Sequence, residues 1–180
     1  MKFKNIILLF FSFFSVHAQD FSQPFQLESY LGEWYQVYSN KIVLSTFEKD
    51  AKCISSFYGI YGKNNISVYN EEYNIKDKKE SIRGYAYIPD YHFPRKLIVY
   101  LNGGSGDAPY WIYELGPLLN HQYQYSIVSD PYKLFLFVLT RNITLFMEEY
   151  NKEVLRKLEV YGFHYFYNKP ILTKQDHCPT

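Results

Sequence analysis

The stretch Tyr30-Leu31-Gly32-Glu33-Trp34-Tyr35 marks the start of the first strand that the sequence predicts. Gly32 lets the backbone turn tightly just before that strand, because a residue without a Cβ reaches conformations that are closed to other residues. Trp34 is then the first large side chain of the strand, and its size suits it to close one end of a folded sheet. We therefore expect Gly32 and Trp34 to act as structural residues.

Short strands separated by turn residues follow through the central part of the chain. Turn signals such as Gly103-Gly104 and Asp130-Pro131 stand between them. Sequential strands with short hairpins indicate an up-and-down antiparallel sheet, which hides its edges best by closing on itself. The sequence therefore predicts an all-β fold, an eight-stranded up-and-down antiparallel β-barrel, with strands at Trp34–Ile42, Lys52–Tyr61, Ile66–Tyr73, Ser81–Ile88, Lys96–Leu101, Pro109–Leu115, Gln122–Ser129 and Leu134–Arg141.

After Arg141 the apolar period changes from two residues to three or four, which is the spacing of one helical face. Thr144 is the expected N-cap of this helix and Gly162 its expected end. We expect one C-terminal α-helix packed outside the barrel, followed by a short strand over Phe163–Tyr167. The expected buried face of the helix consists of Met147, Tyr150, Val154, Leu158 and Tyr161.

The first residues, 1–18, have the pattern of a secretory signal peptide. A basic start is followed by an apolar run over Ile6–Phe14, and small or β-branched residues lead up to Ala18. The alternative is a membrane anchor, but the run is shorter than the roughly 20 residues that cross a bilayer. We expect cleavage after Ala18, one domain over residues 19–180, and a secreted, extracellular protein without stable membrane insertion.

The chain has two cysteines, Cys53 and Cys178. In an oxidising compartment we expect them to pair, and the alternative is two free thiols. A tail that returns from a helix outside the barrel reaches only the outer face of an early strand, so Cys53 should point outward. The period of two along a strand then turns alternate neighbours inward, namely Ile54, Ser56, Tyr58 and Ile60.

Composition and charge argue against several classes of function. The net charge is +1 and no basic stripe runs along the chain, so nothing favours nucleic-acid binding. The five histidines are scattered without metal-ligand spacing. The sequence contains no nucleophile elbow and no phosphate-binding loop. We expect a protein that is not an enzyme and that uses neither a metal nor a cofactor.

Two tripeptides, Asn65-Ile66-Ser67 and Asn142-Ile143-Thr144, are acceptor sequences for N-glycosylation. In a secreted chain they predict surface positions for Asn65 and Asn142, and the alternative is that either tripeptide is unused. Asn65 is the better candidate, because it ends the expected hairpin turn Gly62-Lys63-Asn64-Asn65.

The alternation of side chains along the strands defines one face that would line the barrel interior. An eight-stranded barrel can just enclose one small ligand among such side chains, and the alternative is that they fill a solid core. The 20 Tyr and 15 Phe of the chain offer large apolar walls, with polar tips on the tyrosines. The expected polar contacts to a ligand are Ser56, Tyr58, Asn70 and Tyr110, and the expected apolar walls are Val68, Leu97, Val99, Ile112, Phe135 and Phe137.

Four short motifs, in order along the chain, carry a resemblance to a known family. Gly32-Glu33-Trp34 is similar to the Gly-x-Trp signature of lipocalins, and Leu139-Thr140-Arg141-Asn142 is similar to their closing-strand motif. Asp107–Ile112 and Asp176–Pro179 also resemble segments of known lipocalins. The resemblance, which the bacterial outer-membrane lipocalins share in outline, implies a carrier of a small hydrophobic ligand, such as a fatty acid, a lysolipid, a sterol or a retinoid-like molecule.

The same resemblance implies a structural role for Arg141, which in this family stacks on the tryptophan that Trp34 matches. A cation–π contact of this kind contributes about 0.5–2 kcal/mol. One family motif is missing, because Leu115–Asn120 stands where lipocalins have Thr-Asp-Tyr. Contacts of that loop in other lipocalins therefore do not transfer to this chain.

Two further functions remain open under the resemblance. One is a protein-interaction lipocalin, an inhibitor or surface ligand that acts through open-end loops, for which Asp90–Pro94 and Asn102–Ala108 are the exposed candidates. The other, which we rank last, is a lipid isomerase, since such relatives use an interior thiol. The expected partners are a small hydrophobic ligand and, as a further candidate, a cell-surface receptor, and we expect a monomer.

Overall fold

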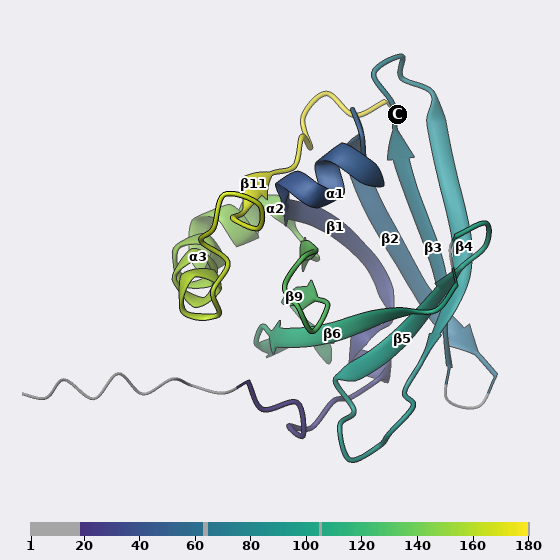
Figure 1. Cartoon of the computed structure of the whole chain (residues 1–180), viewed down its shortest axis with the longest axis vertical. Coiled ribbons are helices and arrows are strands. Elements are labelled where there is room, and N and C mark those ends of the chain that lie inside the picture. Colours follow the sequence, from purple (N-terminus) through teal and green to yellow (C-terminus); the bar gives the residue numbers. More distant parts are fainter. Residues whose placement is uncertain (1–18, 63–64, 105, 180) are drawn as a thin grey trace, which may run out of the picture.

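The computed structural model of this chain describes residues 19–62, 65–104 and 106–179. The expected signal peptide, residues 1–18, lies outside the described residues. A single curved sheet closes into a barrel, with a long helical segment against its outer wall and a short helix at one end (Figure 1). The strand-turn alternation of the sequence is therefore the organising feature of the fold.

Eight strands make the barrel, each antiparallel to its neighbours. The pairing follows chain order from β1 to β6 and continues through β9 to β10, and β10 then pairs with β1 to close the ring. This confirms the predicted eight-stranded up-and-down barrel. Its strands are β1 (Gly32–Ser39), β2 (Lys52–Tyr61), β3 (Asn65–Tyr73), β4 (Lys79–Tyr87), β5 (Lys96–Leu101), β6 (Ala108–Leu115), β9 (Tyr125–Ser129) and β10 (Leu136–Thr140).

The first strand is shorter than the predicted Trp34–Ile42 at its C-terminal end. It stops at Ser39, and Lys41–Thr46 forms the short helix α1. Asn40 has an extended backbone, and its side chain accepts a hydrogen bond from the Val43 N–H. This cap satisfies a donor that the first helical turn leaves without a partner, so the chain turns into a helix where the apolar pattern alone continued the strand.

The predicted strand over Gln122–Ser129 is two strands in the structure. The strand β8 (Gln122–Tyr123) pairs with β7 (Leu118–Leu119) in a small separate hairpin. Gln124 donates its N–H to the Pro117 carbonyl, which leaves it outside the barrel ladder. The barrel strand β9 begins at the next residue.

The last barrel strand is also shorter than the predicted Leu134–Arg141. The carboxylate of Asp130 accepts hydrogen bonds from the backbone N–H groups of Tyr132, Leu134 and Phe135. These bonds fold the chain into a turn in which a side chain replaces backbone partners. The strand β10 therefore starts only after Phe135.

The C-terminal helix lies outside the barrel, as predicted (Figure 1). Its N-cap is Asn142, whose side chain accepts a hydrogen bond from the Leu145 N–H, so the prediction of Thr144 as the cap was wrong. Asn and Thr both suit this position, and the strand ladder ends at Thr140, one residue before the predicted end at Arg141. The helical elements are α2 (Ile143–Leu145), the π-helical segment η2 (Phe146–Tyr150) and α3 (Asn151–Val160).

The π-helical segment changes which residues face the barrel. Met147 was expected on the buried face but is 39% exposed, whereas Phe146, Val154 and Leu158 are fully buried. A π-helix has a wider turn than an α-helix, so residues four apart, rather than three apart, share a face. Phe146 therefore takes the buried position that was predicted for Met147.

The tail returns to the barrel without the predicted strand at Phe163–Tyr167. Those residues form turns after Gly162, whose φ of +90° ends the helix. The buried side chain of Asn168 donates hydrogen bonds to the carbonyls of Gly162 and Lys133 and fixes these turns. A different short strand, β11 (Ile171–Leu172), then pairs with β1.

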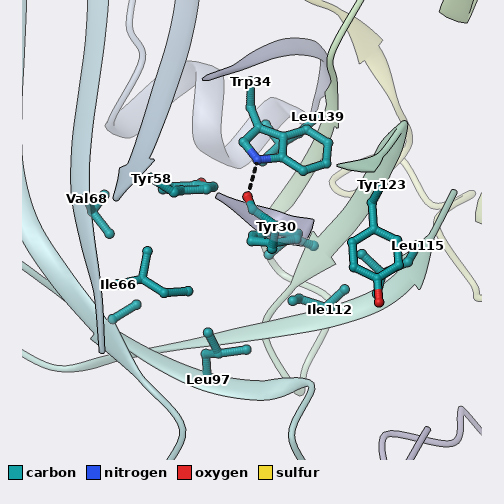
Figure 2. Close-up of a cluster of buried hydrophobic side chains, with 12 residues drawn as sticks. Tyr30, Trp34, Tyr58, Ile66, Val68, Leu97, Ile112, Leu115, Tyr123 and Leu139 are labelled. Carbon is teal, nitrogen blue, oxygen red and sulfur yellow. Dashed lines mark hydrogen bonds between the residues drawn. The ribbon is translucent and has the colours of Figure 1, made fainter. Parts of the chain in front are cut away.

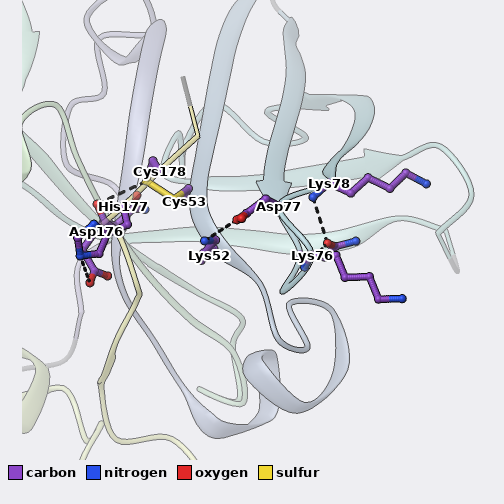
Figure 3. A network of polar contacts seen from close by, with 10 residues as sticks. Lys52, Cys53, Lys76, Asp77, Lys78, Asp176, His177 and Cys178 are labelled. Carbon is purple, nitrogen blue, oxygen red and sulfur yellow. Dashed lines mark hydrogen bonds and ion pairs between the residues drawn. A yellow bond between two sulfur atoms is a disulfide. The ribbon is translucent and has the colours of Figure 1, made fainter.

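Cys53 and Cys178 form the predicted disulfide and close a loop of 125 residues (Figure 3). Cys53 lies at an irregularity of β2 with a φ of 55°, and its N–H donates to the Lys174 carbonyl. Beside it, Lys52 forms an ion pair with Asp77 in the β3–β4 turn, with 2.6 Å between charged atoms. In the chain-entropy model, closing a loop of this length stabilises the fold by roughly 4–5 kcal/mol.

Two hydrophobic clusters hold the barrel and the helix together. The first lies inside the barrel around Tyr30 and Trp34, where the indole N–H donates to the Tyr30 carbonyl over 2.8 Å (Figure 2). The second joins the barrel wall to the helix and contains Phe146, Val154 and Leu158. Burial of each such side chain contributes about 1.5–3 kcal/mol, so the helix is an integral part of the folded domain.

Candidate ligand-binding cavity

The two ends of the barrel differ because successive hairpins alternate between them. The β2–β3 and β4–β5 connections lie at the end that holds Trp34, which we call the closed end. The α1 segment and the β3–β4, β5–β6 and β9–β10 connections lie at the other end, the mouth. The loop Asn102–Ala108 is therefore at the mouth, as predicted, whereas Asp90–Pro94 joins β4 to β5 at the closed end, so its prediction as an open-end loop was wrong. The sequence identified this segment as an exposed loop, but the number of strands that precede it decides at which end of the barrel it lies.

Trp34 and Arg141 close the barrel together. The guanidinium carbon of Arg141 lies 3.7 Å from the centroid of the Trp34 ring, which is fully buried. The guanidinium also donates to backbone carbonyls that surround it. These are the carbonyls of Ser29, Leu31, Glu33 and Tyr123.

The backbone beside this pair does not accommodate a side chain at Gly32. Gly32 has a φ of +95°, and an added Cβ would lie 3.3 Å from the Nη1 of Arg141. A glycine is therefore needed at position 32, both because φ is positive and because a Cβ would crowd the Arg141 guanidinium. Burial lowers the pKa of Arg141 to about 10, which leaves its positive charge in place at neutral pH.

Between the closed end and the mouth lies a cavity of about 530 Å³. A volume of this order accommodates a small organic molecule. Nine of the ten residues that the sequence suggested for ligand contact line it: Ser56, Tyr58, Val68, Asn70, Leu97, Val99, Tyr110, Phe135 and Phe137. The solid-core alternative is therefore wrong.

Ile112 and Ile60 do not lie where the alternation pattern placed them. Ile112 is fully buried and belongs to the cluster inside the barrel, but it does not line the cavity. Ile60, expected to point inward, is 72% exposed near the end of β2. Alternation gives the face of a residue, but the depth along the barrel axis decides whether that face meets the cavity, the core or solvent.

Three tyrosines form a hydrogen-bonded group on the cavity wall. The phenol oxygen of Tyr110 lies 2.7 Å from that of Tyr30 and 3.1 Å from that of Tyr58, and Tyr30 also contacts the Ser126 hydroxyl over 3.0 Å. Burial raises the pKa of all three phenols, so they stay protonated and neutral. Tyr30 was not among the predicted ligand contacts, because it lies on the short 3-10 helix η1 (Glu28–Tyr30), outside the strands whose alternation gave those contacts.

Asn70 has a polar atom in the cavity wall that lacks a partner. Its side-chain Oδ1 is buried and makes no hydrogen bond among the described residues. A buried polar atom without a partner is unfavourable by about 1–3 kcal/mol. A polar group of a bound ligand would relieve this deficit.

Carboxylates that were not among the predicted site residues line the cavity toward the mouth. Glu48, Glu72 and Glu80 all line the cavity. Glu48 is only 8% exposed, and it accepts a 2.6 Å hydrogen bond from the side chain of Gln36. Burial raises the pKa of Glu48 to about 7, and the neighbouring charge of Glu72 acts in the same direction. The alternation of side chains along β3 could have identified Glu72, because this residue has the same inward parity as Asn70.

The two predicted glycosylation positions lie at the edges of elements. Asn142 is exposed, and its Oδ1 is already engaged as the helix cap. Asn65 is the first residue of β3 and is partly exposed. Residues 63 and 64 of the expected turn lie outside the described residues.

The described residues show few groups for other chemistry. No three His, Cys, Asp or Glu side chains among them gather as a metal site. Both cysteines are in the disulfide, so neither offers an interior thiol. No helix in the described part of the chain is long and apolar enough to cross a membrane.

Comparison with known proteins gives a consistent assignment. A family model described as a lipocalin-like domain matches residues 25–168. Apolipoprotein D of Cavia porcellus is 29% identical over 166 residues, covering 87% of this chain and 80% of that protein. Lobster apocrustacyanin A1 has a similar fold, with a TM-score of 0.62 at 19% identity over 86% of this chain and 82% of that one. Japanin from Rhipicephalus appendiculatus, in a structure bound to cholesterol, has a TM-score of 0.57 at 13% identity over 86% and 99%.

The matched residues include the Gly32 turn, the eight barrel strands and the Trp34–Arg141 closure. The resemblance inferred from the motifs is thus supported over most of the chain by an independent family match. This chain belongs to the lipocalin family and is similar to apolipoprotein D.

Proposed function

We propose that this lipocalin is a secreted, extracellular carrier that holds a small hydrophobic molecule inside its barrel and performs no chemistry on it. The observation that carries the proposal is the cavity of about 530 Å³, whose wall is mainly apolar with a few polar groups. Affinity in such a site comes mostly from the apolar area that the ligand buries, at roughly 25 cal/mol per Å² before the costs of binding. The sterol in the Japanin structure is an example of a ligand on this fold.

The cavity also favours carriage over the two alternatives. A protein that acts only through its loops needs no internal space, and one of the two loops proposed for that role lies at the closed end. A lipid isomerase of the thiol type would need a free cysteine, and both cysteines are engaged. We therefore propose a monomeric carrier, with a cell-surface receptor as a candidate partner.

A pair of tryptophan substitutions on one strand tests the proposed site. Val99 faces the cavity, whereas its neighbour Ile98 is on the opposite face of β5 and does not line the cavity. We expect Val99→Trp to fill the cavity and weaken binding of N-phenyl-1-naphthylamine, a neutral apolar probe, at least about tenfold. Ile98→Trp should leave binding unchanged. Equal effects of the two variants would contradict the assignment of the cavity as the site.

Native mass spectrometry of the purified protein checks carriage directly. A co-purifying small molecule, lost on gentle organic extraction, supports the proposal. A persistently empty protein that also fails to bind the neutral probe would contradict it.

Export and glycosylation form a separate part of the proposal. We expect the expressed chain to reach the culture medium without residues 1–18 and to carry glycan at Asn65 and Asn142. Intact mass before and after enzymatic deglycosylation, with Asn65→Gln and Asn142→Gln as single variants, measures each site. Retention in the cell with an intact N-terminus would contradict secretion.

A further inference from the structure

The charged residues that line the cavity all have the same sign. They are acidic, and none of the described lining residues is Lys, Arg or His. The whole chain has a net charge of +1, so this bias is local to the cavity and does not follow from composition. The acidic lining residues are Glu48, Glu71, Glu72, Glu80 and Asp130.

Two of these carboxylates already have strong partners. Glu71 forms an ion pair with Lys79 over 3.0 Å. Asp130 accepts the backbone hydrogen bonds of the β9–β10 turn. Glu48, Glu72 and Glu80 have no cationic side chain within ion-pair distance among the described residues, so they are the charges still available to a ligand.

Glu72 and Glu80 are directly opposite one another in the β3–β4 ladder. They continue the inward faces of their strands, since Asn70 and Ile82, two residues further into the barrel, are likewise paired and line the cavity. Like charges directly opposite one another destabilise a sheet. Partial burial and, to a smaller extent, the charge of Glu80 raise the pKa of Glu72.

Glu48 places a third carboxylate further inside. It follows α1, is 8% exposed and lines the same cavity. From β1, the side chain of Gln36 donates a hydrogen bond to it, and the charge that faces it from β3 is Glu72. A buried carboxylate beside a like charge is unfavourable unless a cation compensates it.

Other groups near this cluster suit a positively charged donor. Phe47 and Phe135 also line the cavity, with ring centroids 5.2 Å apart, and aromatic faces attract cations. Asn70, deeper on the same strand as Glu72, has the buried Oδ1 without a hydrogen-bond donor. These are independent indications of a ligand group that donates hydrogen bonds.

We propose that the hydrophobic ligand carries a protonated amine, which lies at the mouth beside Glu48 and Glu72, with the charge of Glu80 adding to the local negative potential, while its apolar body occupies the barrel. This inference rests on the proposed carrier function and narrows its ligand class. Fatty acids should bind less well than amines, because a ligand carboxylate at the mouth would add a fourth negative charge to three carboxylates that lack a cationic partner.

The proposal has a definite pH dependence. A cation binds the ionised form of Glu48 better than the protonated form, and burial raises the pKa of that carboxyl to about 7. Affinity for an amine should therefore rise as the pH increases from 5.5 to 8, over which the amine itself stays protonated. Affinity for a neutral ligand of the same shape should not rise.

Three ligands with one alkyl chain test the idea, namely dodecylamine, dodecanol and dodecanoic acid. Each competes with N-phenyl-1-naphthylamine at pH 8 and low salt for the wild type and for the double variant Glu48→Gln/Glu72→Gln. We expect dodecylamine to compete at least about tenfold better than dodecanol, and dodecanoate to compete worst. In the double variant the advantage of the amine should fall to about twofold or less, with dodecanol affinity unchanged.

Glu149→Gln is the matched control, because Glu149 is exposed on the C-terminal helix outside the barrel. It should keep the full preference for the amine. Equal competition by the three ligands, or an amine preference that survives the double variant, would overturn the inference and leave the carrier function intact. Failure of all three ligands and of the neutral probe to bind would overturn the carrier function as well.

Discussion

The phenol oxygen of Tyr110 lies 2.7 Å from that of Tyr30, so a strand from the middle of the chain is tied to the short helix that precedes the first strand. Tyr30 is 1% exposed and packs against Trp34 with ring centroids 5.0 Å apart. This bond therefore links the floor of the cavity to the closure of the barrel. The ligand site and the stability of the fold share these residues.

We expect Tyr110→Phe to destabilise the protein by about 1–2 kcal/mol, because it removes the bonds to both Tyr30 and Tyr58 and leaves Tyr58 without that partner. Urea unfolding measures the change. Tyr132→Phe, at a side chain that is 79% exposed, should be neutral. A Tyr110→Phe variant as stable as the wild type would show that the hydrogen bonds of Tyr110 contribute no net stability.

We expect Arg141→Ala to lower the free energy of unfolding by about 3 kcal/mol. The substitution removes the contact with Trp34 and the donors to several buried carbonyls. Arg141→Lys should recover only a small part of the lost free energy of unfolding, since an ammonium cannot reproduce the planar fork of donors. Chemical denaturation is the measurement, and Arg156→Ala on the exposed face of α3 is the control. Full recovery by lysine would contradict the role given to the guanidinium shape.

Removal of the disulfide by Cys53→Ser/Cys178→Ser should lower the free energy of unfolding by up to about 5 kcal/mol, given the loop of 125 residues. Binding of the neutral probe should persist at temperatures where the variant stays folded, because neither cysteine lines the cavity. Loss of binding in a variant that retains its circular dichroism would mean that the bridge shapes the site.

The unliganded protein should become less stable as pH rises toward 7. Burial raises the pKa of Glu48 from 4.5 to about 7, so between these values the folded state holds a proton that the unfolded chain has released. The free energy of unfolding then falls with increasing pH, by at most about 3 kcal/mol in total. Glu48→Gln should flatten this slope in denaturation measured from pH 5 to 8, whereas Glu149→Gln should retain it. An unchanged slope in Glu48→Gln would assign the effect to other groups.

Short-range patterns were sufficient for the barrel and for most of its lining. The period of two along β2, β3 and β5 placed Tyr58, Val68 and Leu97 on the inner face, because the pleat leaves only two sides to choose from. Ile112 has the same inward parity but lies in the core. Its depth depends on the stagger of the strands around the barrel, which no single strand encodes.

The position of Glu48 at the mouth could not be predicted in the same way. Glu48 reaches the cavity because Asn40 stops a strand and starts a helix, and the local apolar pattern gave no sign of that change. The π-helical segment had a similar effect, since it exchanged Met147 for Phe146 on the buried face. Both are cases in which local hydrogen bonding overrode periodicity.

The barrel closes between its first and last strands, and Arg141 reaches the Glu33 carbonyl from 108 residues away. When β1 through β9 have emerged from the ribosome, one edge of the first strand therefore still lacks its partner strand. Contacts so distant in sequence slow folding, and unpaired edges invite association with other chains. The nascent protein thus stays exposed to misassembly until its final third emerges, and expression of chains truncated before β10 should yield aggregates rather than smaller folded domains.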